Sequence, residues 1–266
     1  MSIMTTSKWI FALAVAVSAD ASATATSCSN VSLRNADRMK IRASFESRYC
    51  AKVTRDRCDL RHRNFDQLLE RIISDDRTQH IPLASFMLAT AFVETFSRDF
   101  AASTKEVRGN VNDSRPYWKT DPETKQSYFG RGWLQLTWKD KYQRAKREIK
   151  VDVVNNPDLA LQPSVAFEIL LLGLTQGWIE TYRSSPNGNG GNIPISVNDF
   201  LYLNLPDYAS ARAAVNANCV GKCSKNDRVK IGSKGYIPVP AKLDAALKTE
   251  VEAQFFEQTL CLASLP

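Results

Sequence analysis

Histidine is nearly absent from this sequence, whose 266 residues include only His62 and His80. Neither histidine stands in the ligand spacing with a cysteine that a zinc site requires. Nucleic-acid-binding motifs and internal repeats are also missing. We therefore expect no metal site, no nucleic-acid partner and no repeat architecture.

Long apolar runs are missing after the N-terminus, where Lys8 precedes a run from residue 9 to 17 that is too short to span a bilayer. Small residues follow, and Ala21-Ser22-Ala23 and Ala23-Thr24-Ala25 are candidate cleavage sites. We predict a cleaved signal peptide over residues 1–27 and a secreted or periplasmic protein with no stable membrane insertion. A disordered N-terminus and a membrane anchor are the alternatives.

Alternating strand patterns are few, whereas apolar residues recur at helical spacing. The spacing predicts helices over residues 65–73, 83–97, 138–150, 164–182 and 241–260, with shorter pieces over 197–203 and 208–216. Asn64 is expected to cap the first helix and Pro82 to begin the second. A hairpin is expected within residues 222–240. The predicted fold class is mainly α with a small β element, in one domain over residues 64–266 that follows a cysteine-containing arm over 28–63.

An even number of cysteines follows the predicted cleavage site, which in an exported chain indicates disulfides. The six are Cys28, Cys50, Cys58, Cys219, Cys223 and Cys261. The two close pairs, Cys50 with Cys58 and Cys219 with Cys223, are the natural local bridges. Cys28 would then pair with Cys261 by elimination.

The net charge is +7, which attracts a protein to anionic polymers such as cell-wall glycans, membranes or nucleic acid. The basic residues are scattered along the chain, so solvated helix faces are favoured over a dedicated patch.

Two carboxylates in different surroundings suggest glycoside hydrolysis, which needs a carboxylic acid and a second carboxylate. Glu94 ends an apolar helical stripe, where burial would keep it protonated for an acid role. Glu106 lies in the following polar loop and would be ionised. An ion pair of Glu94 with Arg98 is the structural alternative, and Asp99 and Asp113 are alternative second carboxylates.

The segment Tyr128–Trp138, YFGRGWLQLTW, resembles the Gly-Arg-Gly signature of glycoside hydrolase family 19, which contains class I chitinases and related endolysins. Glu94-Thr95 resembles the end of that family's catalytic helix. Residues 155–163 and 211–216 resemble its Asn-Pro-Asp-Leu and Ala-Arg-x-x-Val-Asn segments. The matches occur in family order over roughly residues 65–260.

The resemblance implies a two-lobed, mostly helical, lysozyme-like fold that uses no metal or other cofactor. It implies that Glu94 is the general acid and Glu106 the general base of an inverting enzyme. Thr137 would hold the nucleophilic water. Sugar would be bound by Gln135 and Asn216, with Tyr128 along the cleft. The expected partner is a polysaccharide, chitin or peptidoglycan, and the protein is expected to be a monomer.

Structural roles compete with several of these assignments. Gly130 and Gly132 are also suited to a tight turn, and Arg131 to a structural ion pair. Trp133 is expected in the core, and Trp138 either there or against sugar. Thr137 is also suited to a helix N-cap.

The chain departs from the family pattern at three places. The histidine usual before the acid is Val93, and the usual glycines after it are Phe96 and Ser97. The glycines usual after Asn216 are also replaced. These departures keep two further functions open: a non-catalytic glycan-binding relative and a lytic transglycosylase acting on peptidoglycan.

Overall fold

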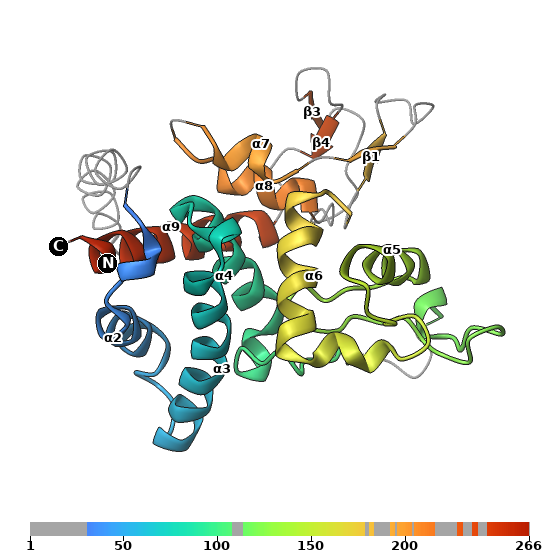
Figure 1. The fold of residues 1–266 in the computed structure, drawn as a ribbon, viewed down its shortest axis with the longest axis horizontal. Coiled ribbons are helices and arrows are strands. Elements are labelled where there is room, and N and C mark those ends of the chain that lie inside the picture. Colours follow the sequence, from blue (N-terminus) through green and yellow to red (C-terminus); the bar gives the residue numbers. More distant parts are fainter. Residues whose placement is uncertain are drawn as a thin grey trace, which may run out of the picture.

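The computed structural model describes residues 31–107, 114–178, 181–183, 192–194, 196–203, 205–215, 228–230, 236–238 and 244–265. Helices dominate this part of the chain (Figure 1). The α-helices are α2 (Arg38–Tyr49), α3 (Arg55–Ser74), α4 (Ile81–Thr95), α5 (Lys139–Ile149), α6 (Pro163–Thr175), α7 (Asn198–Leu201), α8 (Tyr208–Val215) and α9 (Asp244–Ser264). Short 3-10 helices are η1 (Leu33–Asn35), η2 (Asp76–Thr78), η3 (Phe96–Arg98), η4 (Pro116–Trp118) and η5 (Pro157–Leu161).

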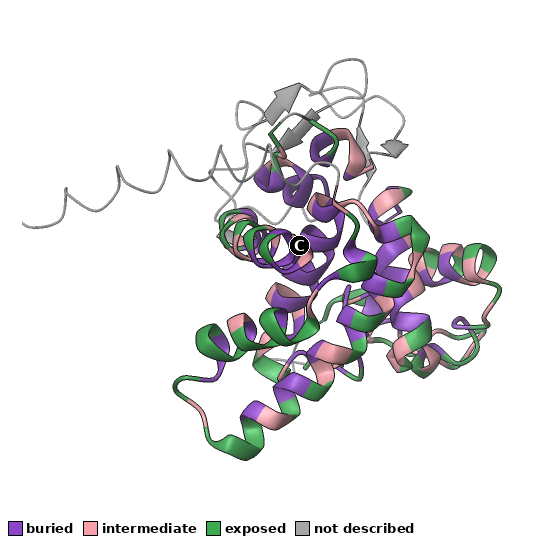
Figure 2. Ribbon diagram, turned by 60° about the vertical axis from the view of Figure 1, so that its left-hand side comes forward, coloured by how far each residue is buried: buried purple, intermediate pink, exposed green. Residues whose placement is uncertain are grey.

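The core is built around α4, whose residues from Leu83 to Phe92 are all buried. A helix that is apolar on all sides must be enclosed by other elements. The helix α9 crosses α4 in the most extensive contact between two elements (Figure 1), and α9 also packs on α2 and α8. Contacts with α3, α6 and α7 cover further faces of α4, and Figure 2 shows burial concentrated where the helices face one another.

The helices α2 and α3 form a hairpin that leads into this core. The carboxylate of Asp37 caps α2 by accepting hydrogen bonds from the backbone N–H groups of Met39 (2.9 Å) and Lys40 (3.2 Å). A disulfide joins Cys50, at the end of α2, to Cys58 in the first turns of α3. This bridge confirms the first predicted pairing.

The helix cap predicted at Asn64 is wrong. The helix α3 begins at Arg55, after Thr54, so Asn64 lies in its interior and the division expected at residues 63 and 64 falls within one helix. The side chain of Asn64 donates instead to the backbone carbonyl of Asp99 (2.8 Å). The first turns of α3 carry mostly charged and polar residues, so the spacing of apolar residues does not predict a helix there.

The β structure is small, as predicted. The strands β1 (Thr181–Arg183) and β2 (Asn192–Pro194) pair antiparallel, and so do β3 (Arg228–Lys230) and β4 (Tyr236–Pro238). The second pair confirms the hairpin expected within residues 222–240. The helix predicted to reach residue 182 is too long, because α6 ends at Thr175 and Gly177 takes a left-handed conformation (φ 62°).

The mainly helical fold class is therefore confirmed. The helix positions expected around residues 83–97, 138–150, 197–203 and 241–260 agree with α4, α5, α7 and α9 to within a few residues. No helix among the described residues is long and apolar enough to cross a membrane. The predicted signal peptide lies outside the described residues, and so do Cys28, Cys219 and Cys223. Cys261 is disulfide-bonded, and the two remaining pairings stay predictions.

Candidate active site

Glu94 lies in the last turn of α4 with its side chain 20% exposed. Its carboxylate forms an ion pair with Arg212 of α8, whose guanidinium is almost fully buried. The apolar surroundings expected for Glu94 are thus only partly present. Its partner is also not Arg98, the partner in the structural alternative, which is exposed one turn further on.

Sequence reasoning overlooked Arg212. The segment around it had been noted for Asn216, which lies outside the described residues. One signal was available, because Arg212 is the only charged residue in an otherwise small and apolar stretch, Ala211-Arg212-Ala213-Ala214-Val215. A charge on such a helix face is expected to have a buried partner.

Two residues that depart from the family pattern near Glu94, Val93 and Phe96, are packed against the core, whereas Ser97 is exposed. Val93 is half-buried against the core. The ring of Phe96 lies 4.3 Å from that of Phe92 and 5.9 Å from that of Tyr49, which belongs to α2. Thr95 donates its hydroxyl to the carbonyl of Ala91 (2.6 Å). The end of the helix is therefore fixed by aromatic packing where the family has small residues.

Glu106 is tied to the Gly-Arg-Gly turn at two points. Its backbone N–H donates to the carbonyl of Gly130 (2.7 Å), and its Oε2 accepts from the N–H of Gly130 (3.1 Å). Its Oε1 accepts from the hydroxyl of Tyr117 (3.1 Å) and lies 3.5 Å from Nη2 of Arg115. The carboxylate is thus held in one orientation while its side chain stays 25% exposed.

The alternative carboxylates lie elsewhere. Asp99 forms ion pairs with Arg57 (2.8 Å) and Arg61 (3.0 Å) of α3. Burial acts to raise the pKa of Asp99, but these two guanidinium groups outweigh it and hold the pKa below its usual value. Asp113 lies outside the described residues. Among the described candidates, only Glu106 contacts the Gly-Arg-Gly turn.

The turn itself is compact because two glycines permit close approach. Arg131 makes antiparallel bridges with Lys105 and with Leu136. Gly132 has a φ of 76°, and a Cβ atom there would lie 2.7 Å from the carbonyl oxygen of Ala160. A Cβ atom on Gly130 would lie 2.8 Å from Oε1 of Gln135 and 3.3 Å from Oε2 of Glu106.

Arg131 has the structural role expected as an alternative. Its guanidinium is 5% exposed, pairs with Asp158 (2.9 Å) and donates to the hydroxyl of Tyr142 (3.1 Å). It also lies 3.7 Å from the centre of the Phe129 ring. Trp133 is fully buried, as expected, and its indole N–H donates to the carbonyl of Phe100 (3.0 Å). These contacts fix the turn against α5, η5 and the segment after η3.

The predicted sugar-binding residues are engaged in internal contacts. The amide of Gln135 donates to the carbonyls of Gly132 (2.8 Å) and Thr104 (3.2 Å). Tyr128 is buried, and its hydroxyl donates to the carbonyl of Val154 (3.1 Å) and lies 2.7 Å from the Thr124 hydroxyl. Their sugar-binding roles stay predictions.

Thr137 is half-buried, and its hydroxyl donates to the carbonyl of Gln135 (2.8 Å). The hydroxyl oxygen can still accept a hydrogen bond from a water molecule. Thr137 is not the helix N-cap, since that position in α5 belongs to Trp138. Trp138 is 45% exposed and meets the Tyr117 ring edge-on at 4.9 Å, so it is a surface residue rather than a core residue.

The polar loop that carries Tyr117 is ordered by Asp121. Its carboxylate accepts from the backbone N–H groups of Thr124 (3.0 Å) and Glu123 (3.1 Å) and from Nζ of Lys139 (2.9 Å). These hydrogen bonds lower the pKa of Asp121 to about 2. The described part of this loop, from residue 114 on, is therefore a defined structure that supports a contact of Glu106.

One group of potential metal ligands occurs in the described part of the chain, formed by Cys50, Cys58 and His62. The two sulfurs are joined in the disulfide, so neither is a thiolate that could ligate an ion. The group lies on α2 and α3, apart from the Gly-Arg-Gly turn.

A family model described as chitinase class I matches residues 77–231, which contain Glu94, Glu106, the Gly-Arg-Gly turn and Arg212. The chain belongs to glycoside hydrolase family 19. Endochitinase 1 of Theobroma cacao is 34% identical to it over 104 residues, which cover 35% of this chain and 32% of that protein. Endochitinase 1 of Gossypium hirsutum is 30% identical over 167 residues, which cover 57% of this chain and 49% of that protein.

This family 19 chain thus spans about a third to a half of the length of the curated relatives it matches. Among solved structures it is similar to chitinase C from Streptomyces griseus HUT6037, with 19% identity and a TM-score of 0.45 over 84% of this chain and 77% of that chain. The family assignment rests on the family model. The cysteine-containing α2–α3 hairpin precedes the matched residues.

Proposed function

We propose that the chain is an exported, inverting endo-glycosidase that hydrolyses β-1,4 bonds of N-acetylglucosamine-containing polymers, with chitin as the first substrate and peptidoglycan as a possible second. Glu94 is the general acid and Glu106 the general base. The observation that carries the proposal is the fixed orientation of Glu106 against the family's Gly-Arg-Gly turn, together with Glu94 at the end of a buried helix. Peptidoglycan is anionic, which suits the net charge of +7.

The contacts of the two carboxylates hold each of them in a defined orientation. In an inverting enzyme the acid protonates the leaving oxygen while the base activates a water on the opposite face of the sugar. Glu106 accepts from Gly130 N–H and Tyr117 O–H, which favours a defined orientation for a base. Thr137 holds the water with its hydroxyl. Glu94 is oriented by Arg212, which reaches it from another helix.

The departures near Glu94 support a second candidate, a glycan-binding relative without turnover. Val93 and Phe96 replace residues that the family usually has there, and the Phe96 ring packs on the ring of Phe92. A lytic transglycosylase, which works with one glutamate, is the third candidate. It would release an anhydro sugar, so its products differ from those of a hydrolase.

The test is product analysis by mass spectrometry after digestion of chitin oligomers and of peptidoglycan, using wild type, Glu94→Gln and Glu106→Gln. We expect each substitution to lower kcat by a factor of about 10² or more, since each removes a proton-transfer group. Glu148→Gln, the same change at an exposed position of α5, is the matched control. Equal turnover by Glu94→Gln and wild type would refute the acid assignment, and binding without turnover by wild type would favour the second candidate.

A further inference from the structure

The turn that follows the helix of Glu94 has a strained backbone. Asp99 and Phe100 are consecutive residues with positive φ, 55° and 67°. Residues with a Cβ atom rarely adopt this conformation, so neighbouring contacts must hold it. Because the turn begins four residues after Thr95 ends α4, its geometry fixes the direction in which the chain leaves the helix.

One face of α3 supplies the contacts that hold this turn. Arg57 and Arg61 both pair with Oδ1 of Asp99, and Asn64 donates to the Asp99 carbonyl (2.8 Å). These three residues recur at steps of four and three, which places them on the same side of a helix. On the other side of the turn, Trp133 donates to the Phe100 carbonyl (3.0 Å). The turn therefore joins α3, the helix of Glu94 and the Gly-Arg-Gly segment.

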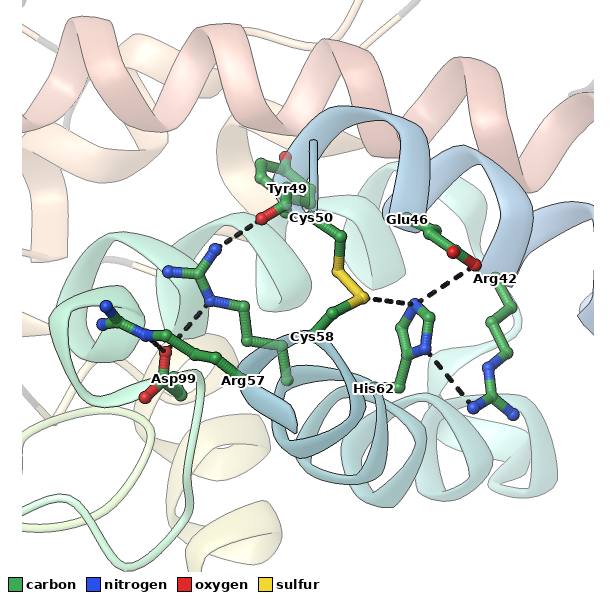
Figure 3. Close-up of a disulfide and its surroundings, with 9 residues drawn as sticks. Arg42, Glu46, Tyr49, Cys50, Arg57, Cys58, His62 and Asp99 are labelled. Atoms are coloured by element: carbon green, nitrogen blue, oxygen red, sulfur yellow. Dashed lines mark hydrogen bonds and ion pairs between the residues drawn. A yellow bond between two sulfur atoms is a disulfide. The ribbon is translucent and has the colours of Figure 1, made fainter. Parts of the chain in front are cut away.

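Arg61 is the centre of these contacts. Figure 3 shows two of its partners, Tyr49 and Asp99, near the Cys50–Cys58 disulfide. The side chain of Arg61 is 6% exposed, and it donates to the Tyr49 carbonyl at the end of α2 as well as to Asp99. Its guanidinium also lies 4.4 Å from the centre of the Phe96 ring, in the turn directly after Glu94 and Thr95. A planar guanidinium can donate to Asp99 and to the Tyr49 carbonyl while it lies over the Phe96 ring, which an ammonium group cannot do.

The disulfide fixes the position of Arg61 relative to Tyr49. Cys50 follows Tyr49 in the chain, and Cys58 lies one turn before Arg61 on α3. The bridge holds the two Cα atoms 5.2 Å apart. The Tyr49 carbonyl and the guanidinium are thereby kept within reach of each other.

We propose that Arg61, held in place by the Cys50–Cys58 disulfide, is a positioning residue for Glu94, acting through Phe96 and Asp99. The proposal rests on the proposed function, because it assigns these residues to the orientation of its general acid. The α2–α3 hairpin that carries Arg61 precedes the residues matched by the family model. The hairpin meets the end of α4 at Phe96, which replaces a residue that is usually glycine in the family. Its side chains thereby hold the turn at Asp99 and Phe100 in place.

The experiment uses the full chain in four forms besides wild type: Arg61→Met, Arg61→Lys, the double variant Cys50→Ala/Cys58→Ala, and Arg38→Gln as control. Arg38 pairs with Glu70 (2.7 Å), so its loss also removes a contact between α2 and α3, but one that does not reach the turn. Replacing the cysteines avoids a chemical reductant, which would also attack the disulfide of Cys261.

The first readout is amide hydrogen exchange in peptides covering residues 95–101. The N–H groups of Asp99, Phe100 and Ala101 are all hydrogen-bonded within this turn. We expect exchange there to be roughly tenfold faster in Arg61→Met and in the double cysteine variant, and unchanged in the control, because local opening releases these amides. Unchanged exchange in both variants would overturn the proposal.

The second readout is kcat and KM on a chitin oligomer, measured well below each variant's Tm. Misplacing a catalytic group should lower kcat by about tenfold in Arg61→Met and leave KM within about twofold. Arg61→Lys should recover part of the loss. If Arg61→Met lowers the Tm but leaves kcat and the pH profile unchanged, while Glu94→Gln is inactive, only the positioning role would be overturned. Full activity of Glu94→Gln would overturn the proposed function itself.

Discussion

Gly130 and Gly132 lie in the same turn but are required for different reasons. At Gly132 the neighbour of an added Cβ atom would be a backbone carbonyl, that of Ala160 at 2.7 Å, and the φ of 76° is itself unfavourable for other residues. At Gly130 the neighbours would be side-chain atoms, Oε1 of Gln135 and Oε2 of Glu106. A backbone oxygen cannot move aside cheaply, whereas the end of a side chain can.

We therefore expect alanine to have different effects at these two positions, a loss of stability at Gly132 and a loss of activity at Gly130. Gly132→Ala should lower the free energy of unfolding by about 1–3 kcal/mol, because it combines a clash with a strained conformation. Gly130→Ala should cost less stability but displace the Glu106 carboxylate and lower kcat. Urea unfolding and turnover of a chitin oligomer measure the two effects. Equal losses of stability in the two variants would contradict this division.

Single residues also show where sequence reasoning reached its limit at the site. Glu94 and Glu106 are predicted from helix phase and from the Gly-Arg-Gly signature, which are local in sequence. Arg212 was missed because its pairing with Glu94 joins residues 118 apart. Likewise, the hydroxyl of Tyr128 donates to the carbonyl of Val154, 26 residues away, and no local pattern connects these two residues.

Among the elements, helices with a strong apolar stripe were predicted well, and α3 was not. Its first turns carry charged residues, and their role is to reach Asp99, which no periodicity can reveal. The helix α6 was predicted too long because the apolar run continues beyond the point where Gln176 and Gly177 end the helix. The extent of a helix thus follows local propensity only where tertiary contacts agree with it.

The cap of α2 gives a prediction at the scale of an element. Asp37→Ala removes two hydrogen bonds to the first turn and should lower the free energy of unfolding by about 1 kcal/mol. In a protein of this size that corresponds to a fall in Tm of roughly 2–4 °C. Asp37→Asn is the control, since asparagine caps helices equally well. A similar Tm for the alanine and asparagine variants would show that the cap contributes little.

At the scale of the whole molecule, several carboxylates have a lowered pKa. Hydrogen bonds from backbone N–H groups and Lys139 set the pKa of Asp121 to about 2, and those from Lys146 and Asn155 do the same for Asp152. Arg77 lowers the pKa of Asp75. The folded state binds these protons more weakly than the unfolded chain, in which an aspartate has a pKa of about 3.9.

The contribution of these aspartates to the free energy of unfolding should therefore be fully present above pH ~4 and be lost as the pH drops toward ~2, because the unfolded chain takes up these protons first. Glu257 and Glu250 act in the opposite direction, since burial raises the pKa of each. Thermal unfolding followed from pH 7 to pH 2 measures the balance. Asp75→Asn should make the fall of Tm between pH 4 and pH 2 less steep. A Tm that rises steadily below pH 4 would contradict the prediction.

The pairing of α4 with α9 has a consequence for biosynthesis. Arg48 of α2 and Glu252 of α9 form an ion pair although they lie 204 residues apart in the sequence. A nascent chain that stops short of α9 lacks one wall around its most apolar helix, and long-range contacts of this kind form late. The polypeptide emerging from the ribosome would then stay loosely folded until nearly all of the described chain has been made. For an exported chain, which is what we propose, that delay would keep the protein unfolded while it crosses the membrane.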